Sequence, residues 1–313
     1  MPSTSEIQPV VIMLGPTASG KTDAAIAVAK EIGGEIISSD SRLFYRGMDI
    51  GTAKPTAAQL SEVRHHLVSI ADPDEPLSLA VFQGLCTRII VDLHKQQKIP
   101  ILVGGTGQYI RAITEDWKIP EQAAEPPLRK GLEQLAKENG AVELFRYLQY
   151  LDPQAADSID SRNIRRVVRA LEVILLTGKK FSDQKAKGLT PYRVIQLGIR
   201  WNRQDLYQRI DMRIEQMIKD GLVDEVRSLL AKGYTSDLPG MSAIGYNEIA
   251  DYLNDRCTLE ESILLIKRKT RQFIRRQANW FKPDDPDIHW FDPCPEMVGR
   301  MVSLIRRMIN VTG

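Results

Sequence analysis

A glycine-rich segment near the N-terminus carries the residue types that bind phosphate groups. It matches the pattern G-x-x-x-x-G-K-[ST] and consists of Gly15, Pro16, Thr17, Ala18, Ser19, Gly20, Lys21 and Thr22. Glycines allow backbone N–H groups to curl around phosphate oxygens, and the N-terminus of the following helix adds partial positive charge. Lys21 can neutralise phosphate charge, and we expect the Thr22 hydroxyl to be a ligand for Mg²⁺. This segment, the phosphate loop, predicts a diphosphate or triphosphate site, with a turn that binds nothing as the alternative.

Two further polar residues are expected at the same edge of the fold. Asp40 follows a predicted strand over 35–38, and Thr106 follows another over 99–103. Ligands bind at the carboxyl ends of the strands in open parallel sheets, so both residues should face the phosphate loop. Asp40 can act there as a general base or as an outer partner of Mg²⁺, and Thr106 can donate to a leaving-group oxygen. The alternatives are a turn residue at Asp40 and a helix N-cap at Thr106.

Two arginines of a predicted C-terminal helix are further candidates for binding phosphate. Arg209 and Arg213 are four residues apart and therefore share one face of that helix. They could hold a diphosphate from the side opposite Lys21. The alternative is pairing with acidic residues of the same helix, which are Asp205, Asp211 and Glu215.

The elements that must position these residues indicate an α/β core interrupted by helices. Apolar runs at 10–14, 35–38 and 99–103, separated by helical patterns such as 22–33, predict a parallel sheet. From about residue 117 only helical patterns follow, at 128–137, 141–151 and 162–176, until a strand at 194–199. Further helices are predicted at 204–232, 242–253 and 259–280. We therefore expect a first part of the core at 1–116, a helical insertion at 117–192 and the rest of the core at 193–313.

Composition excludes several classes of protein. The cysteines Cys86, Cys257 and Cys294 stand singly, so neither a zinc site nor a disulfide framework is predicted, and a reducing cytoplasm fits best. The apolar runs are too short to span a bilayer, and the N-terminus lacks the pattern of a signal peptide. The pair His65-His66 has no cysteine or carboxylate at ligand spacing, so we interpret it as structural.

The net charge of +2 hides two basic runs. Residues 161–200 contain ten Lys or Arg against two acidic residues, and 263–283 contain seven and no acid. The second run is interleaved with Phe273, Trp280 and Phe281. Basic helices with aromatic residues are typical of proteins that bind a polyanion, although each run alone could be a solvated face. Beside a diphosphate site, the two runs together favour RNA as the partner.

Motifs distributed over nearly the whole chain follow, in order, those of one enzyme family. They are GPTASGKT at 15–22, DSRLFYRGMDIGTAKP at 40–55, HHL at 65–67, LVGGTGQY at 102–109, LR at 128–129, RRVVRALEV at 165–173, LYQRIDMRIEQMIKDGLVDEV at 206–226, AIGY at 243–246 and TRQFIRRQANWF at 270–281. Together they resemble the tRNA dimethylallyltransferases, the bacterial-type tRNA isopentenyltransferases. The segment YRGMDIGTAKP is much more specific than the phosphate loop alone.

The resemblance implies a P-loop NTPase-like α/β core with a parallel sheet and a helical insertion that contacts the tRNA anticodon arm. It implies transfer of a dimethylallyl group from dimethylallyl diphosphate to N6 of adenine 37, with Mg²⁺. Separately, we expect a cytoplasmic protein that acts as a monomer. Asp40 then matches the general base, Thr106 the threonine at the target and leaving diphosphate, residues 17–22 the donor loop, and Arg213 a diphosphate ligand. The residues that match tRNA-contacting segments are Asp40, Ser41, Arg42, Leu43, Thr106, Arg129, Arg165, Arg166, Val167, Val168, Arg169, Ser242, Ala243, Ile244, Gly245, Tyr246 and Asn247.

The chain departs from the family pattern at a few of these positions, and two other functions stay open. Leu43 stands where many members have Gln, and Ser242 and Asn247 stand where basic or amide residues are frequent. A small-molecule kinase would account for the phosphate loop and Asp40 but not for the basic helices. An RNA-binding protein with a relic loop would account for the basic helices but not for an intact Lys21-Thr22.

Overall fold

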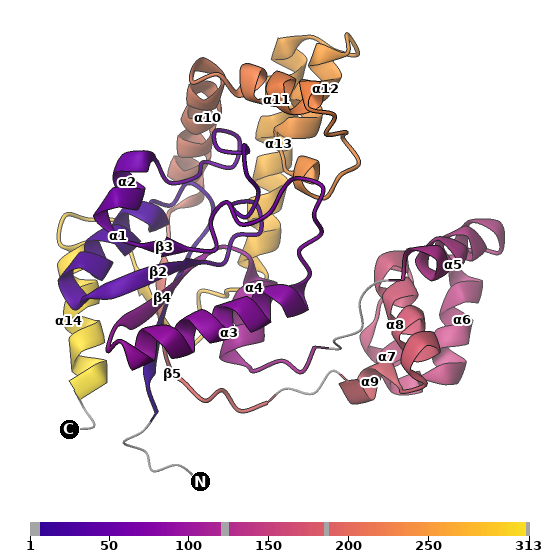
Figure 1. Ribbon diagram of the computed structural model, residues 1–313, viewed down its shortest axis with the longest axis horizontal. Coiled ribbons are helices and arrows are strands. Elements are labelled where there is room, and N and C mark those ends of the chain that lie inside the picture. The colour runs from indigo at the N-terminus through magenta and orange to yellow at the C-terminus, as the bar shows by residue number, and fades with distance from the viewer. Residues whose placement is uncertain (1–6, 120–124, 185–187, 311–313) are drawn as a thin grey trace. The chain divides into compact units, whose positions relative to one another are not determined.

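The computed structural model describes residues 7–119, 125–184 and 188–310 (Figure 1). The chain divides into two compact units, of which the first is Met1–Thr114 together with Thr190–Gly313 and the second is Glu115–Leu189. The second unit falls in the part of the chain for which the sequence predicts a helical insertion. Every predicted candidate for phosphate binding or catalysis belongs to the first unit.

A six-stranded sheet with the order β3-β2-β4-β1-β5-β6 lies at the centre of the first unit. All of its strand pairs are parallel, so the predicted α/β class with a parallel sheet is confirmed. The register places Leu14 beside Gly104 and Gly198, which brings the carboxyl ends of three central strands together. The strands are β1 (Pro9–Leu14), β2 (Gly34–Ser38), β3 (His65–His66), β4 (Ile99–Gly104), β5 (Arg193–Ile199) and β6 (Ile288–Phe291).

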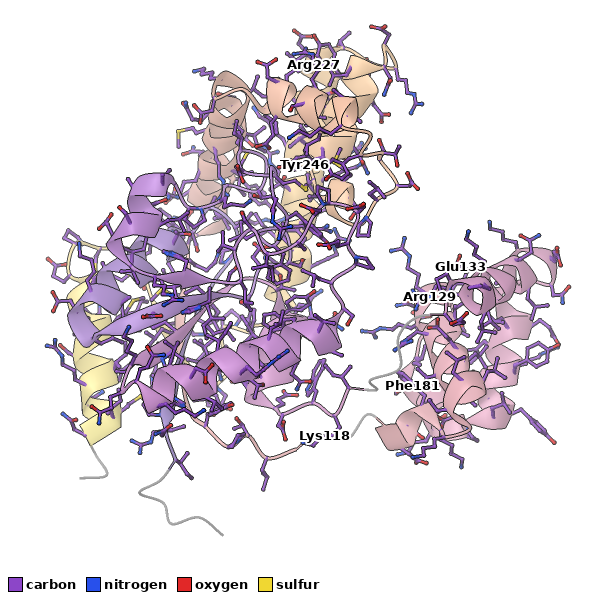
Figure 2. All side chains as sticks on the ribbon, in the orientation of Figure 1. Lys118, Arg129, Glu133, Phe181, Arg227 and Tyr246 are labelled. Carbon is purple, nitrogen blue, oxygen red and sulfur yellow. The ribbon has the colours of Figure 1, made fainter. Side chains whose placement is uncertain are left out.

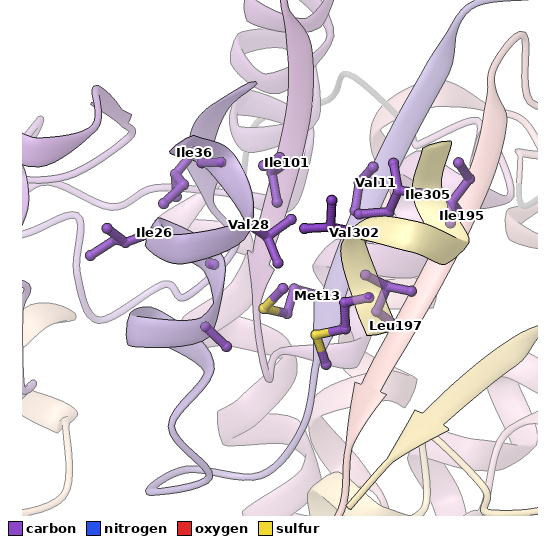
Figure 3. Close-up of a cluster of buried hydrophobic side chains, with 14 of the residues drawn as sticks. Val11, Met13, Ile26, Val28, Ile36, Ile101, Ile195, Leu197, Val302 and Ile305 are labelled. Carbon is purple, nitrogen blue, oxygen red and sulfur yellow. The ribbon is translucent and has the colours of Figure 1, made fainter. Parts of the chain in front are cut away.

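Helices cover both faces of the sheet, which explains why the central strand is apolar at every position from Val10 to Leu14. On one face, α1 (Lys21–Ile32) and α14 (Met297–Asn310) pack on the sheet, and Figure 3 shows side chains of this cluster, among them Val11, Met13 and Val302. On the other face, α3 (Leu79–Lys95) and α4 (Gly107–Thr114) pack on the alternate residues of the same strands. The short α2 (Ala57–Glu62) precedes β3.

A group of helices after β5 builds a third cluster of buried residues beside the sheet. These helices are α10 (Arg203–Lys219), α11 (Leu222–Ala231), the 3-10 turn η2 (Gly240–Ser242), α12 (Tyr246–Leu253) and α13 (Leu259–Ala278). The single helix predicted at 204–232 is wrong, because Gly221 adopts a left-handed φ of 101° and separates α10 from α11. The helix predicted at 242–253 begins at Tyr246, after the 3-10 turn.

Strand β3 gives the two adjacent histidines a place at the edge of the sheet. His66 Nε2 lies 2.7 Å from Glu35 Oε2, and Lys98 also binds this half-buried cluster through Glu35. In the described ranges, no group of His, Cys, Asp or Glu side chains is arranged to hold a metal ion. Over the same residues, no helix has the length and apolar character needed to cross a membrane.

The second unit is a bundle of helices around its own core, which includes Leu132, Leu148 and Leu171. A buried carboxylate, Glu172, forms hydrogen bonds that connect different segments of this unit. Glu172 accepts hydrogen bonds from Arg129 at 2.7 Å (Arg129 is labelled in Figure 2), from Arg169 at 2.8 Å and from the backbone N–H of Glu125 at 3.0 Å. The helices are α5 (Pro126–Glu138), α6 (Ala141–Leu151), α7 (Pro153–Ser158), α8 (Ile164–Thr177) and α9 (Phe181–Gln184).

Replacing Glu172 with glutamine is expected to lower the free energy of unfolding by about 2–4 kcal/mol, because two arginines lose a buried counter-charge. Burial alone would raise the pKa of Glu172, but the hydrogen bonds from Arg169 and Arg129 outweigh it and lower that pKa. The stabilisation is therefore present at neutral pH and is lost as the pH falls below the ordinary glutamate value. Urea unfolding followed by circular dichroism measures the change, with the exposed Glu133→Gln of α5 as the matched control. Equal unfolding midpoints for the two variants would contradict the prediction.

Candidate functional site

The phosphate loop connects β1 to α1, and two of its residues have left-handed backbone conformations. Ala18 has φ 62° and Gly20 has φ 86°, both in the left-handed region, which is costly for a residue with a side chain. The Ser19 side chain is buried, and its hydroxyl has no hydrogen-bond partner among the described residues. A buried hydroxyl normally has a water or a ligand as its partner, and a loop of this conformation before a helix is a common setting for an anion site.

Side chains from the second half of the chain fix the backbone of this loop. Trp201 Nε1 donates to the carbonyl of Ser19 at 3.0 Å, and Arg209 Nε donates to the carbonyl of Ala18 at 2.9 Å. The guanidinium of Arg209 also lies over the Trp201 ring, 4.4 Å from its centroid, so the two side chains support each other. The strained backbone at Ala18 is thus stabilised by residues that lie almost two hundred positions away.

Lys21, Asp40 and Arg213 share one electrostatic environment. Burial lowers the pKa of Lys21 to about 8, the charge of Asp40 opposes this change, and the charge of Arg213 adds to it. Lys21 Nζ donates to the carbonyl of Pro16 at 2.6 Å. Two cations held close together beside a single carboxylate leave positive charge that an anion can neutralise.

The acidic residues proposed as alternative partners of Arg213 are engaged elsewhere. Asp211 pairs with Arg271 at 2.5 Å, Glu215 pairs with Lys267 at 2.7 Å, and Asp205 accepts from Asn202. Among the described residues, Arg213 makes neither a hydrogen bond nor an ion pair. Burial lowers the pKa of its guanidinium, which Asp40 opposes and Arg209 reinforces. The interpretation of Arg213 as an anion ligand is therefore compatible with its surroundings.

Two adjoining cavities bring the predicted residues together. The first, of about 490 Å³, has Thr17, Asp40, Thr106 and Arg213 in its lining. The second, of about 410 Å³, extends over the loop itself, from Ala18 to Thr22, and Ala18 and Arg213 line both cavities. The first cavity also has apolar walls from the helices after β5, formed by Ile210, Ile214, Met217, Leu222, Ile266 and Phe273. An anion site thus adjoins a space that is polar on one side and apolar on the other.

Asp40 and Thr106 both line the first cavity. Oδ1 of Asp40 accepts from the backbone N–H of Arg42 at 3.0 Å, so Asp40 is a turn residue as well as a lining residue. Oδ2 of Asp40 and the Thr106 hydroxyl have no hydrogen-bond partner among the described residues, and Thr106 does not cap α4 with its side chain. Two residues that line the cavity next to the anion site thus have side-chain oxygens that are not occupied by other described residues.

Known proteins with similar sequences and structures show the family to which this chain belongs. The family described as IPP transferase matches residues 43–284. The chain is 45% identical to the tRNA dimethylallyltransferase of Dehalococcoides mccartyi, over 98% of this chain and 94% of the relative. It is 39% identical to the crystal structure of the full-length tRNA isopentenylpyrophosphate transferase from Bacillus halodurans, with a TM-score of 0.72 over 96% of this chain and 97% of that chain. A eukaryotic dimethylallyltransferase solved while acting on tRNA has a TM-score of 0.79 at 26% identity, over 96% of this chain and 78% of that chain.

The chain belongs to the IPP transferase family. This confirms the resemblance seen in the sequence motifs and the prediction that the protein is an enzyme of the prenyltransferase class. The names of its relatives describe dimethylallyl transfer and tRNA, in agreement with the predicted activity.

In the first unit, several of those residues surround the cavity and others do not. Arg42 Nη1 donates to Ser242 Oγ at 3.0 Å and to the carbonyl of Pro239 at 3.1 Å, and so joins two segments of the cavity wall. Ser242, Ala243, Ile244 and Gly245 line the same cavity, whereas Ser41 and Leu43 do not. Leu43 lies with Thr22 and His65 around a separate small cavity.

Tyr246 is a correction to the set of predicted tRNA contacts. Its side chain is fully buried, and its hydroxyl donates to Glu225 Oε1 at 2.7 Å, so the residue packs inside the protein (Figure 2). Glu225 also accepts from the backbone N–H groups of residues 49–51. Tyr246 therefore supports the loop that lines the cavity and does not reach a partner molecule. The neighbouring Asn247 amide lies against the backbone carbonyls of Ser236 and Met241.

In the second unit, the predicted tRNA-binding segment contains residues of different kinds. Val167 and Val168 are buried in the core of the bundle, so their assignment as contacts is also wrong at the level of the side chain. Arg129 and Arg169 are bound to Glu172. Arg165 and Arg166 are exposed and have no partner within the described ranges, so they are the free cations of this segment.

The sequence motifs did not single out Gln277 and Trp201, although both contact the phosphate loop. Gln277 Oε1 accepts from the backbone N–H of Thr17 at 3.2 Å, and its Nε2 donates to the carbonyl of Gly105 at 3.0 Å. Trp201 follows β5 by two residues, and Gln277 lies inside the matched segment 270–281, but neither residue type signals phosphate binding. Gln277 lies in the basic run 263–283, where the sequence pattern indicates charge and gives no signal for an amide contact.

Proposed function

We propose that this chain transfers a dimethylallyl group from dimethylallyl diphosphate to N6 of adenine 37 in tRNA, which gives the N6-dimethylallyl base and diphosphate. One observation carries the proposal: Thr17, Asp40, Thr106 and Arg213 line a single cavity next to the phosphate loop. Membership of the IPP transferase family supports it.

The donor diphosphate is proposed to occupy the cavity over the phosphate loop. Lys21 and Arg213 supply positive charge there, and the unpartnered Ser19 hydroxyl supplies a donor. The Thr22 hydroxyl lines this cavity, and no described residue forms a hydrogen bond with it. One hydroxyl beside a diphosphate fits Mg²⁺, which keeps several waters and takes much of its coordination from substrate phosphates. We propose Thr22 as the protein ligand, and the metal would supply charge neutralisation of the diphosphate.

The transfer itself is proposed to depend on Asp40 as the base. The exocyclic amine of adenine is a weak nucleophile because its lone pair is delocalised, so the step needs a positioned base and an activated donor. The bond between N6 and the first allylic carbon forms as the bond from that carbon to the diphosphate oxygen breaks. The N6 proton passes to Asp40, while Lys21, Arg213 and Thr106 stabilise the charge on the leaving diphosphate.

The tRNA is proposed to bind so that the target base leaves its stack and enters the first cavity. Free cations are available to hold the phosphates of the RNA. Besides Arg165 and Arg166, these are the exposed residues Arg268, Arg275 and Arg276 of α13, which have no ion pairs in the described part of the chain. We also propose that the protein acts as a monomer in the cytoplasm, which its three free cysteines suit.

Incubation of the full chain with unmodified tRNA and labelled dimethylallyl diphosphate tests the proposal. Label is expected in the tRNA. Digestion to nucleosides is expected to recover it as N6-dimethylallyladenosine, and mapping of nuclease fragments is expected to place it at position 37. A parallel incubation with γ-labelled ATP tests the kinase alternative. Label from ATP in a small molecule, with none from the prenyl donor in tRNA, would overturn the proposal.

Binding of tRNA is expected to weaken steeply with salt, because each arginine that neutralises a phosphate releases counterions. Contacts to six or more phosphates would lower the affinity by roughly 10³-fold between 50 and 200 mM salt. Titration of labelled tRNA at several salt concentrations measures the slope, and Arg165→Gln/Arg166→Gln is expected to make the slope shallower by about two units. A matched control is Arg146→Gln, an arginine of α6 that pairs with Glu143. A slope unchanged in the double variant would show that Arg165 and Arg166 do not contact the RNA backbone.

A further inference from the structure

We propose that Gln277 is a positioning residue, which holds the donor-binding loop and the Gly105–Thr106 turn at a fixed separation during prenyl transfer. The inference rests on the proposed function, because it assigns these two segments to donor and acceptor. Gln277 lies in the last turn of α13 and is 7% exposed. The amide oxygen of Gln277 accepts from the backbone N–H of Thr17 at 3.2 Å, and its amide nitrogen donates to the carbonyl of Gly105 at 3.0 Å.

The chemistry of the contact explains why an amide stands at this position. Thr17 offers a backbone N–H donor and Gly105 offers a backbone carbonyl acceptor. A carboxamide presents an acceptor and a donor at a fixed separation, which matches that pair. An ionised carboxylate could only accept, and a cation could only donate. The amide also adds no net charge beside a site that must bind a diphosphate.

Close packing around Gln277 leaves the two segments little freedom. A methyl group added at Gly105 would collide with Nε2 of Gln277 and would lie 3.1 Å from the carbonyl oxygen of Gly15. Gly105 thus lies close both to the amide of Gln277 and to the backbone of Gly15. A side chain at position 105 would have to displace the Gln277 amide, so glycine at this position is compatible with the bridge.

The separation of the two segments matters for the reaction because each carries groups of the site. Thr17 and Thr106 line the same cavity, together with Asp40 and Arg213. A displacement of about 1 Å between the bound donor and the groups that act on it can cost about 10²-fold in rate. Gln277 itself also lines this cavity, and loss of its amide bridge would allow such a displacement while Asp40, Thr106 and Arg213 all remain.

Gln277→Met tests the inference, since methionine keeps the length of the side chain and removes both hydrogen bonds. We expect kcat for prenyl transfer to fall about tenfold to hundredfold, while KM for tRNA changes little. Amide hydrogen exchange is expected to accelerate at Thr17 and across residues 104–107. The matched control is Gln272→Met, which replaces an exposed glutamine of the same helix and is expected to leave kcat and exchange unchanged.

A double-mutant cycle separates a positioning role from a purely structural one. If Gln277 acts through the placement of Thr106, Thr106→Ala should cost much less in the Gln277→Met protein than in the wild-type chain. Additive effects, or a fall in activity that only follows a fall in the folded fraction, would overturn the inference. Should Gln277→Met fail to fold, Gln277→Glu carries the test, because it keeps the acceptor for Thr17 and loses the donor to Gly105. That variant adds a charge to the site, so its test is hydrogen exchange alone: exchange is expected to stay slow at Thr17 and to accelerate across residues 104–107, and unchanged exchange at both segments would overturn the inference.

The proposed function and this inference fail in different ways. A wild-type chain that transfers no prenyl group to tRNA would remove the proposed function. Hydrogen exchange measures the bridge without any turnover, so unchanged exchange of both segments in Gln277→Met would overturn the inference even in an active enzyme.

Discussion

Replacing Asp40 with asparagine is expected to slow prenyl transfer by about 10²- to 10⁴-fold, the usual contribution of a positioned base. Asparagine keeps the size of the side chain and can still accept from the backbone N–H of Arg42, so the turn after β2 should persist. It cannot take the N6 proton. Single-turnover measurements with saturating donor and tRNA report the chemical step, and filter binding with labelled tRNA reports affinity, which should change little.

Asp40→Asn also removes a negative charge that acts on Lys21. Asp40 opposes the fall in the pKa of Lys21, so its removal should lower the affinity of that lysine for protons. A variant of the fully exposed Asp74, Asp74→Asn, serves as the matched control and should leave both rate and affinity intact. If Asp40→Asn weakened tRNA binding and kept the single-turnover rate, Asp40 would be an RNA contact and not the base.

The parallel core was predictable because its central strands are buried on both faces. Val10 to Leu14 are apolar without alternation, and only a strand between two layers of helices requires that pattern. Strands β3 and β6 lie at the two edges of the sheet and are short. The side chains of β3 are two histidines, which carry no apolar signal, so sequence periodicity could not reveal it.

The candidate site was predictable where its residues follow strands. Asp40 and Thr106 come directly after β2 and β4, and the geometry of a parallel sheet brings such positions to one edge. Gln277 lies on a helix and could not be placed in this way, and Trp201 follows β5 by two residues but its indole carries no signal for phosphate binding. They lie 260 and 182 positions from the loop residues they contact, and nothing in their local sequence encodes those distances.

Family motifs gave wrong tRNA contacts where the matching side chains are buried, because a motif match does not say which side chains are exposed. Val167, Val168 and Tyr246 belong to segments that match the family, but each side chain faces a core. On α8 the apolar and basic residues alternate with helical spacing, so one face packs and the other is free. The arginines of such a segment, and not the whole segment, are the candidates for RNA contact.

Replacing Lys21 with methionine is expected to lower kcat/KM for the prenyl donor by about 10³-fold. A unit charge about 4 Å from a phosphate charge contributes roughly 4 kcal/mol at the effective dielectric constant of a protein surface, and 1.36 kcal/mol corresponds to a factor of ten. Initial rates at varied dimethylallyl diphosphate measure the loss. Lys30→Met is the matched control, because Lys30 is a lysine of the same helix whose side chain is exposed and pairs with Glu62.

The lowered pKa of Lys21 gives this interaction a dependence on pH whose sign follows from the structure. In the free protein the pKa is about 8, so the amine is charged at neutral pH and becomes neutral as the pH rises. A bound diphosphate favours the charged amine and raises its pKa, so binding takes up a proton above pH 8. The affinity for dimethylallyl diphosphate, measured by calorimetry without tRNA, should therefore fall up to tenfold per pH unit above 8. The Lys21→Met protein should lose that decline, and a wild-type affinity that is constant from pH 7.5 to 9.5 would place the lysine outside the diphosphate site.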